Sequence, residues 1–176
     1  TYDDQTFTIT IDPIADTPNI TDAATDEDVE SSSGLIITRN AVDGNEVSHF
    51  KITDITNGTL SNSSQAIINN NAFITFAEGN AGLRFDPDDD YFGDGFVTIQ
   101  ASVCESEQCL GGEEVTATIT IDPVNDEPSF DYTDAVTVDE DSDSYEGSWA
   151  FDISVGPENE NDQTPSFTII SNDHES

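Results

Sequence analysis

Apolar and polar residues alternate over short runs along most of the chain. In residues 115–121, Val115, Ala117, Ile119 and Ile121 fall on one side of an extended chain and the threonines between them on the other. The same alternation occurs in 97–103 and 7–11. A period of two with many β-branched residues is typical of half-buried strands. Shorter strands are predicted at 34–38, 49–55, 66–68, 72–76 and 82–85.

Turn signals separate these runs, and no helical pattern competes with them. No window keeps an apolar i, i+3, i+4, i+7 pattern long enough for a helix of three turns. Asn57-Gly58 predicts a type I′ hairpin, and Asn69-Asn70-Asn71 predicts another turn. Short strands at this spacing favour an all-β fold, an immunoglobulin-like or cadherin-like Greek-key sandwich.

An internal repeat sets the expected domain organisation. Residues 6–20 and 116–130 match at nine of fifteen positions, and Asp26-Glu27-Asp28 recurs as Asp139-Glu140-Asp141. A period near 110 residues suits a whole domain of a tandem array rather than a solenoid unit. We therefore expect the last strand of a preceding repeat in 1–15, a complete sandwich in 16–124 and the first half of the next repeat in 125–176.

Charge narrows the function classes. The chain has 3 Lys and Arg against 38 Asp and Glu, a formal net charge of −35. Without a basic patch we expect no nucleic-acid partner and no docking on anionic lipid. No apolar run is long enough to span a bilayer, so no membrane insertion is predicted. So many carboxylates repel one another, and bound or condensed cations relieve that repulsion.

The residues at the repeat boundaries resemble a known family. Asn125-Asp126-Glu127-Pro128 follows a Thr/Ile strand and precedes the acidic run 139–141, as in the cadherin-like tandem repeats of large bacterial surface proteins. Segments 85–96 and 156–167 are also similar to such repeats. The resemblance implies β-sandwich modules strung in a rod, calcium at the junctions and a role in adhesion or surface architecture. Glu127 departs from the Asn that cadherins carry there, and Ala15 takes the Asn place in the first copy.

Calcium is the expected cofactor for a second, chemical reason. Calcium binds six to eight oxygen ligands, several of them carboxylates, and ten of the residues from 122 to 146 are acidic with none basic. A solvated acidic linker with diffuse cations is the alternative. Pro157-Glu158-Asn159-Glu160 matches a cadherin calcium motif by letters, but we exclude it because it lies too far past the junction. We interpret 86–91 as a structural turn. The predicted metal ligands are Asp12, Asp16, Glu27, Asp28, Asp122, Asn125, Asp126, Asp139, Glu140 and Asp141.

Cys104 and Cys109 flank a predicted hairpin between the last two strands of the complete repeat. Two thiols are half a structural zinc set, and no clustered His completes it. A disulfide is therefore expected, with reduced thiols as the alternative. A disulfide indicates an oxidising compartment, so we expect an extracellular protein, secreted or on the cell surface.

No catalytic or cofactor-binding residues are predicted, and we do not expect an enzyme. Neither His lies near a recognisable nucleophile, and carboxylate pairs are too common here to indicate a glycosidase. Trp149 is expected in the core of the second module, with a sugar-stacking platform as the alternative.

The predicted function is a structural or adhesive module of an extracellular surface protein, stiffened by calcium at its junctions. Two alternatives stay open. One is a filament subunit completed by strand exchange between chains, and the other is an accessory module of a secreted polysaccharide-active enzyme. Expected partners are neighbouring repeats or other copies of the chain, with a cell-surface or glycan ligand as a further candidate.

Overall fold

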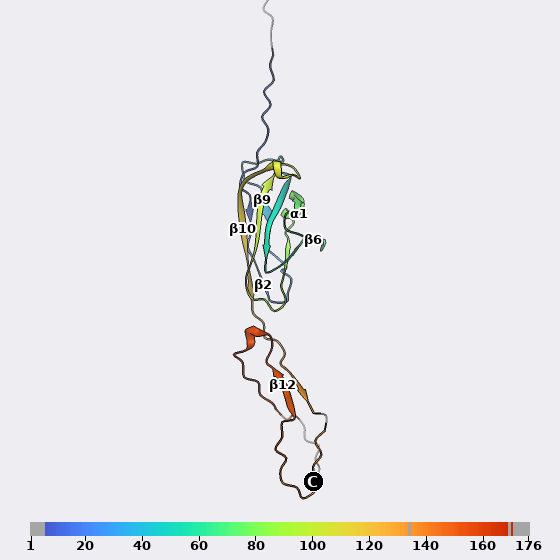
Figure 1. Ribbon diagram of the computed structural model, residues 1–176. Coiled ribbons are helices and arrows are strands. Elements are labelled where there is room, and N and C mark those ends of the chain that lie inside the picture. The colour runs from blue at the N-terminus through green and yellow to red at the C-terminus, as the bar shows by residue number, and fades with distance from the viewer. Residues whose placement is uncertain (1–5, 134, 169, 171–176) are drawn as a thin grey trace, which may run out of the picture. The chain divides into compact units, whose positions relative to one another are not determined.

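The computed structural model describes residues 6–133, 135–168 and 170 (Figure 1). Residue contacts divide the chain into two units, Thr1–Pro123 and Val124–Ser176, called unit 1 and unit 2 below. Both are built of β-strands joined by turns, with one short α-helix and two 3₁₀-helices among the described residues. The predicted all-β class is confirmed.

The strands of unit 1 belong to three sheets, and the chain crosses between them several times. The elements of unit 1 are β1 (Asn19–Ile20), β2 (Ala23–Asp26), β3 (Ile37–Thr38), β4 (His49–Thr56), β5 (Gly58–Ser61), β6 (Ile67–Ile68), β7 (Phe73–Thr75), α1 (Phe76–Asn80), β8 (Arg84–Pro87), β9 (Gly93–Ser102), η1 (Glu107–Cys109) and β10 (Leu110–Asp122). One sheet has the order β2-β10-β9-β4-β7, a second has the order β6-β5-β8, and β1 pairs with β3. Within the five-stranded sheet, β2 and β10 are parallel and the other neighbours antiparallel.

One hydrophobic core joins these sheets. On β10, Ala117, Ile119 and Ile121 are buried, as the alternation predicts. The three-stranded sheet contributes Leu60 and Phe85 to the same cluster of buried side chains. Since the sheets share this core, unit 1 is a β-sandwich, whereas the immunoglobulin-like Greek-key connectivity stays a prediction.

The predicted hairpin at Asn57-Gly58 is wrong, although the turn is present. Asn57 has φ 63°, but β4 belongs to the five-stranded sheet and β5 to the three-stranded sheet. A Cβ on Gly58 would lie 2.5 Å from the ring of Phe85. Glycine is therefore needed because the backbone passes close to a core ring as it crosses between sheets.

The strand predicted over residues 7–11 is not formed within the described part of the chain, and its place in a preceding repeat stays a prediction. This segment is extended but pairs with no strand in the described part of the chain. Phe7, Ile9 and Ile11 are 84%, 73% and 88% exposed. Alternation alone does not make a strand, because a strand requires a neighbour for its backbone hydrogen bonds.

Unit 2 contains one antiparallel strand pair among its described residues. β11 (Ser129–Tyr132) pairs with β12 (Ala150–Ser154), and η2 (Glu158–Glu160) follows. Trp149 contacts the rings of Phe130 and Phe167, yet it is 46% exposed. This aromatic cluster lies at the surface of the described residues, and the core position of Trp149 in a complete second module stays a prediction.

Candidate metal sites

The first acidic group lies at one edge of unit 1, where two parallel strands end together. Asp26 of β2 pairs with Asp122 of β10, and the N–H of Glu27 donates to the carbonyl oxygen of Asp122 at 2.9 Å. The parallel register therefore brings the first Asp-Glu-Asp run to the end of its own module.

Glu27 is the buried member of this edge group, at 2% exposure. Beside it in sequence, Asp28 adopts φ 58°, and its Oδ1 accepts a hydrogen bond from the N–H of Asp90 at 3.0 Å. Burying a carboxylate is costly unless hydrogen bonds or a cation compensate for the lost hydration. Sequence reasoning missed Asp90, although the run of three aspartates at 88–90 was a visible signal.

The second acidic group lies within unit 2 and centres on Glu160. Its Oε1 accepts hydrogen bonds from the N–H of Asp126 at 2.9 Å and from Nε2 of Gln163 at 3.0 Å. Gln163 Nε2 also donates to Oδ1 of Asn125 at 3.0 Å. Glu160 is 5% exposed, and its Oε2 has no hydrogen-bond partner among the described residues. A Cβ at position 156 would clash with this oxygen, so Gly156 leaves the space in which the carboxylate sits.

None of the three Lys and Arg side chains forms an ion pair with the carboxylates of these two groups in the described structure. Residues 124–176 contain no Lys or Arg. In unit 1, Lys51 pairs with Glu107 at 2.7 Å and Arg84 pairs with Glu30 at 3.0 Å. Arg39 stacks on the ring of Phe76 at 3.6 Å. The three basic residues of the chain are thus engaged away from both acidic groups, which leaves cations from solution to balance the charge.

The structure separates the ligands expected at the first repeat boundary. Asp16 donates its N–H to the carboxylate of Asp43, and Ala15 lies against Gly111 at the start of β10. Glu27 lies at the other end of that strand, about 35 Å away at roughly 3.3 Å per residue. Asp12 belongs to the exposed extended segment. Asp12 and Asp16 therefore do not join Glu27 and Asp28.

The structure also separates two parts of the second predicted group. The hairpin pairs Ser129 with Ser154 at one end and Tyr132 with Ala150 at the other. Asn125 and Asp126 precede the first end, whereas Asp139, Glu140 and Asp141 lie in the loop beyond the second. Glu160 takes the place beside Asp126 instead. The distance from the junction that led us to exclude this segment is not present in the structure, because β12 brings Glu160 back to Asp126. Whether the segment binds calcium stays a prediction.

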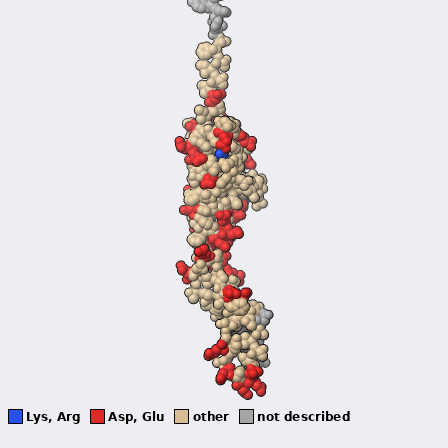
Figure 2. All heavy atoms as spheres, in the orientation of Figure 1, with Lys and Arg blue, Asp and Glu red and all other residues tan. Residues whose placement is uncertain are grey.

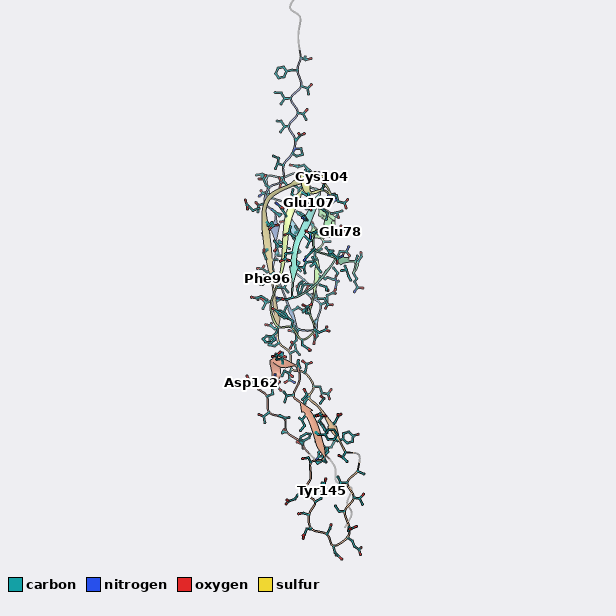
Figure 3. The ribbon with its side chains drawn as sticks, viewed as in Figure 1. Glu78, Phe96, Cys104, Glu107, Tyr145 and Asp162 are labelled. Atoms are coloured by element: carbon teal, nitrogen blue, oxygen red, sulfur yellow. A yellow bond between two sulfur atoms is a disulfide. The ribbon has the colours of Figure 1, made fainter. Side chains whose placement is uncertain are left out.

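Cys104 and Cys109 form the predicted disulfide, with 5.5 Å between their Cα atoms. It closes the connection between β9 and β10, which pair as predicted. In Figure 3, Cys104 and Glu107 are labelled at the same end of unit 1. Glu107 of this loop pairs with Lys51 of β4, so the loop is tied to the five-stranded sheet as well.

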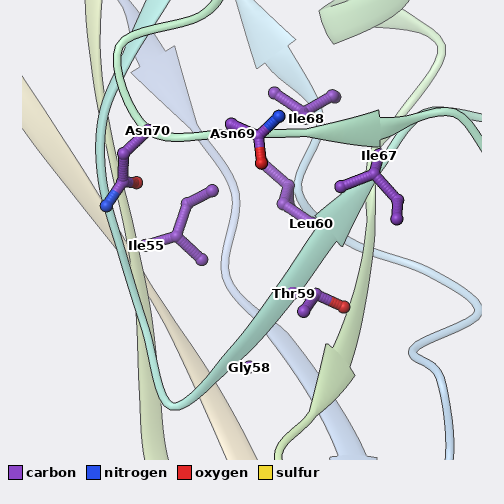
Figure 4. A pocket seen from close by; sticks show the side chains of 8 residues that line it. All are labelled: Ile55, Gly58, Thr59, Leu60, Ile67, Ile68, Asn69 and Asn70. Carbon is purple, nitrogen blue, oxygen red and sulfur yellow. The ribbon is translucent and has the colours of Figure 1, made fainter.

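An open hollow lies beside β5 and β6 (Figure 4). It is lined by the apolar side chains of Ile55, Leu60, Ile67 and Ile68 and by the neutral residues Gly58, Thr59, Asn69 and Asn70. Its volume is about 380 Å³. Because no lining residue is ionisable, the lining offers neither a general acid nor a carboxylate ligand.

Among the described residues, no helix has the length and apolar character needed to cross a membrane. Comparisons of the chain with protein-family models, with curated proteins and with solved structures find no match. The two acidic groups therefore provide the main evidence on function.

Proposed function

We propose that the chain is a structural or adhesive repeat module of an extracellular surface protein, in which calcium binds the two acidic groups. The observation that carries this proposal is the buried Glu160, whose Oε2 has no hydrogen-bond partner among the described residues. Together with the absence of Lys and Arg from residues 124–176, it favours an added cation.

Calcium suits these groups better than magnesium. Calcium accepts six to eight oxygen ligands in flexible geometry, whereas magnesium requires a near-ideal octahedron and retains its waters. Asp126, Asn159 and Glu160 supply carboxylate and amide oxygens in unit 2, and the edge group of unit 1 supplies Glu27, Asp28, Asp90 and Asp122. These residues lie at strand ends and in loops, where the backbone can adjust to the flexible coordination geometry of calcium.

The two groups bracket the connection between the units in sequence, since Asp122 and Asp126 lie on either side of 123–125. Calcium bound at either group neutralises negative charge next to this connection. It thereby weakens the repulsion between carboxylates that keeps the connection in many conformations. We infer that calcium stiffens the connection. A series of stiff modules holds an adhesive surface at a defined distance from the cell.

An extracellular location rests on two features. The disulfide is of the kind that persists in oxidising compartments. The internal repeat and the sequence resemblance to cadherin-like bacterial surface repeats favour a module of a larger array.

Titration calorimetry with calcium in physiological sodium chloride tests the metal site. Glu160→Gln keeps an oxygen acceptor but removes the charge, and it should weaken calcium binding in unit 2 by about tenfold or more. Glu158→Gln, on an exposed residue of the same 3₁₀-helix, is the matched control and should bind as the native chain does. Equal binding by the native chain and Glu160→Gln would contradict this site.

A further inference from the structure

Residues 6–12 have nearly the same sequence as part of the strand β10, but they pair with no strand in the described structure. Thr6–Asp12 is identical to Thr116–Asp122 of β10 at six of seven positions. In β10 the backbone pairs with β2 on one side and β9 on the other, and Ile119 and Ile121 are buried. We call residues 6–12 the donor segment, which extends away from the rest of unit 1 (Figure 1). Its apolar side chains are largely exposed.

Unit 2 has the matching edge for such a strand. The recurring Asp-Glu-Asp run aligns Val136–Asp139 with β2, the parallel neighbour of β10. We call residues 136–139 the acceptor segment. It pairs with no strand in the described structure, and Val136 and Val138 are 42% and 55% exposed.

The β11–β12 strand pair of unit 2 exposes apolar side chains, whereas the β1–β3 pair of unit 1 buries them. Ser129 pairs with Ser154 as Asn19 pairs with Thr38, so β11–β12 repeats the arrangement of β1–β3. In unit 1 the apolar residues of that pair, Ile20 and Ile37, are 7% and 0% exposed. In the sequence repeat Phe130 takes the place of Ile20, and the β11–β12 register shifts after Ser129. Phe130 of β11 and Ile153 of β12 are 40% and 45% exposed.

We propose that the donor segment of one copy pairs in parallel with the acceptor segment of a second copy. The register of β10 on β2 sets Ile9 opposite Val136, Thr10 opposite Thr137 and Ile11 opposite Val138. The alternating side chains of the donor, Phe7, Ile9 and Ile11, then face the exposed apolar side chains of unit 2, as their counterparts face the core in unit 1. The partner is therefore another molecule of this chain.

The donor segment and the connection to unit 2 meet unit 1 at opposite ends of β10. Ala15 lies against Gly111 at the start of β10, and Asp122 ends that strand at the far edge of unit 1. The donor segment thus enters unit 1 at one end of β10, and the connection to unit 2 leaves from the other (Figure 1). Pairing between copies joins an end of one molecule to a different site on the next, and such heterologous contacts extend into rings or filaments.

Charge and area predict how strong this association is. Residues 6–11 carry no charge, and Asp12 is the one charged residue of the donor segment, placed opposite Asp139 as Asp122 is placed opposite Asp26. This pair adds to the repulsion between copies that each carry −35. The repulsion is screened by salt, and association should strengthen as ionic strength rises. A strand with three apolar side chains, of which an aromatic one buries about 150–250 Å², is a small interface and gives weak, concentration-dependent association.

Sedimentation velocity of the full chain over a wide concentration range, at low and high sodium chloride, tests the proposal. The native chain should grow in mass with concentration, more so at high salt. Ile9→Asp places a carboxylate in the apolar contact and should weaken self-association by more than about tenfold. Thr10→Asp makes a similar charge change at the counterpart of exposed Thr120 and should associate much as the native chain does.

Disulfide trapping tests the register. A mixture of Thr10→Cys chains and Thr137→Cys chains should give an oxidised heterodimer, whereas Thr10→Cys with Ser144→Cys should not. All three positions are exposed, so unit 1 should unfold at the native temperature in every cysteine variant. A native chain that stays monomeric at all concentrations overturns the proposal, as does equal association of Ile9→Asp and Thr10→Asp or equal trapping of both cysteine pairs.

Discussion

At the scale of single residues, a few backbone positions decide where unit 1 turns. Gly34 has φ 90°, and a Cβ there would lie 2.5 Å from the carbonyl oxygen of Asp22 and 2.7 Å from the side chain of Ala23. Only glycine combines that conformation with so close an approach. It permits the chain to return from β2 to β3, which brings Leu35 and Ile37 into the core.

Gly34→Ala should therefore destabilise unit 1 by about 1–3 kcal/mol, through backbone strain and the close contact with β2. Gly44→Ala is the matched control, because a Cβ there meets only the flexible side chain of Glu46. Urea unfolding measures both. Equal midpoints for the two variants would show that Gly34 is not structurally required.

Glu78 gives unit 1 a predictable response to acid. Its carboxylate accepts hydrogen bonds from the N–H and the hydroxyl of Thr75 at 2.9 and 2.8 Å, in a capping box at the start of α1. The backbone hydrogen bond from Thr75 is the largest cause that lowers the pKa of Glu78 below its ordinary value of 4.5. A lowered pKa stabilises the fold above that value, and the stabilisation is lost as pH falls through the folded-state pKa.

Glu78→Gln should accordingly lower the unfolding midpoint at neutral pH and lose this disadvantage in acid. The expected difference at neutral pH is about 0.5–2 kcal/mol, typical of a helix cap. Urea unfolding of the native chain and of Glu78→Gln, at neutral pH and in acid, measures this difference. Glu113→Gln, at an exposed residue, is the control. If the difference in unfolding free energy persisted unchanged in acid, the charge of the Glu78 carboxylate would not be what stabilises the helix cap.

Sequence alone could predict side-chain burial on strands but not the partners of Glu160. Alternation marks Ile119 and Ile121 as inward-facing, and the structure buries both. The contact between Glu160 and Asp126 depends on the return of the chain through β11 and β12 across 34 positions. No local pattern encodes such a return, so matching letters in the 158–160 segment could not be distinguished from chance.

At the scale of elements, the β9–β10 hairpin shows how a covalent bond and strand pairing act together. The disulfide closes a loop with a sequence separation of 5 residues. The chain-entropy model assigns about 2 kcal/mol to a loop this small. The loop adds the ion pair between Glu107 and Lys51 to the same end of the sheet.

Replacing both cysteines, Cys104→Ser with Cys109→Ser, should therefore lower the free energy of unfolding by about 2 kcal/mol. Urea unfolding of the native and substituted chains measures the change. Intact mass of the untreated native chain should lie two hydrogens below the reduced mass. Labelling of both thiols in denatured, unreduced protein would contradict the bond and the extracellular argument.

Element positions were predictable, while several sheet partners were not. The pattern located β9 and β10 and placed the disulfide between them. It assigned a hairpin to Asn57-Gly58, which is wrong, and a strand to residues 7–11, which has no partner strand in the described part of the chain. Each case concerns a partner strand that local sequence does not specify, because pairing depends on which distant backbone lies alongside.

At the scale of the whole molecule, charge dominates the surface. Acidic side chains are spread over the face shown in Figure 2, where basic side chains are scarce. With a net charge of −35, the chain is sensitive to salt and to divalent cations. Screening by salt acts on all exposed carboxylates, whereas a specific calcium site depends on a few buried oxygen ligands such as those of Glu160.

Small-angle scattering of the native chain, with calcium and after chelation, tests the central claim that calcium stiffens the connection between units. At constant ionic strength, calcium should narrow the distribution of interatomic distances at large separations, and chelation should broaden it while the circular dichroism of unit 1 is unchanged. Asp126→Ala with Glu160→Gln should keep the broad distribution even in calcium. An unchanged maximum dimension and spread on chelation would contradict the calcium-stiffened module.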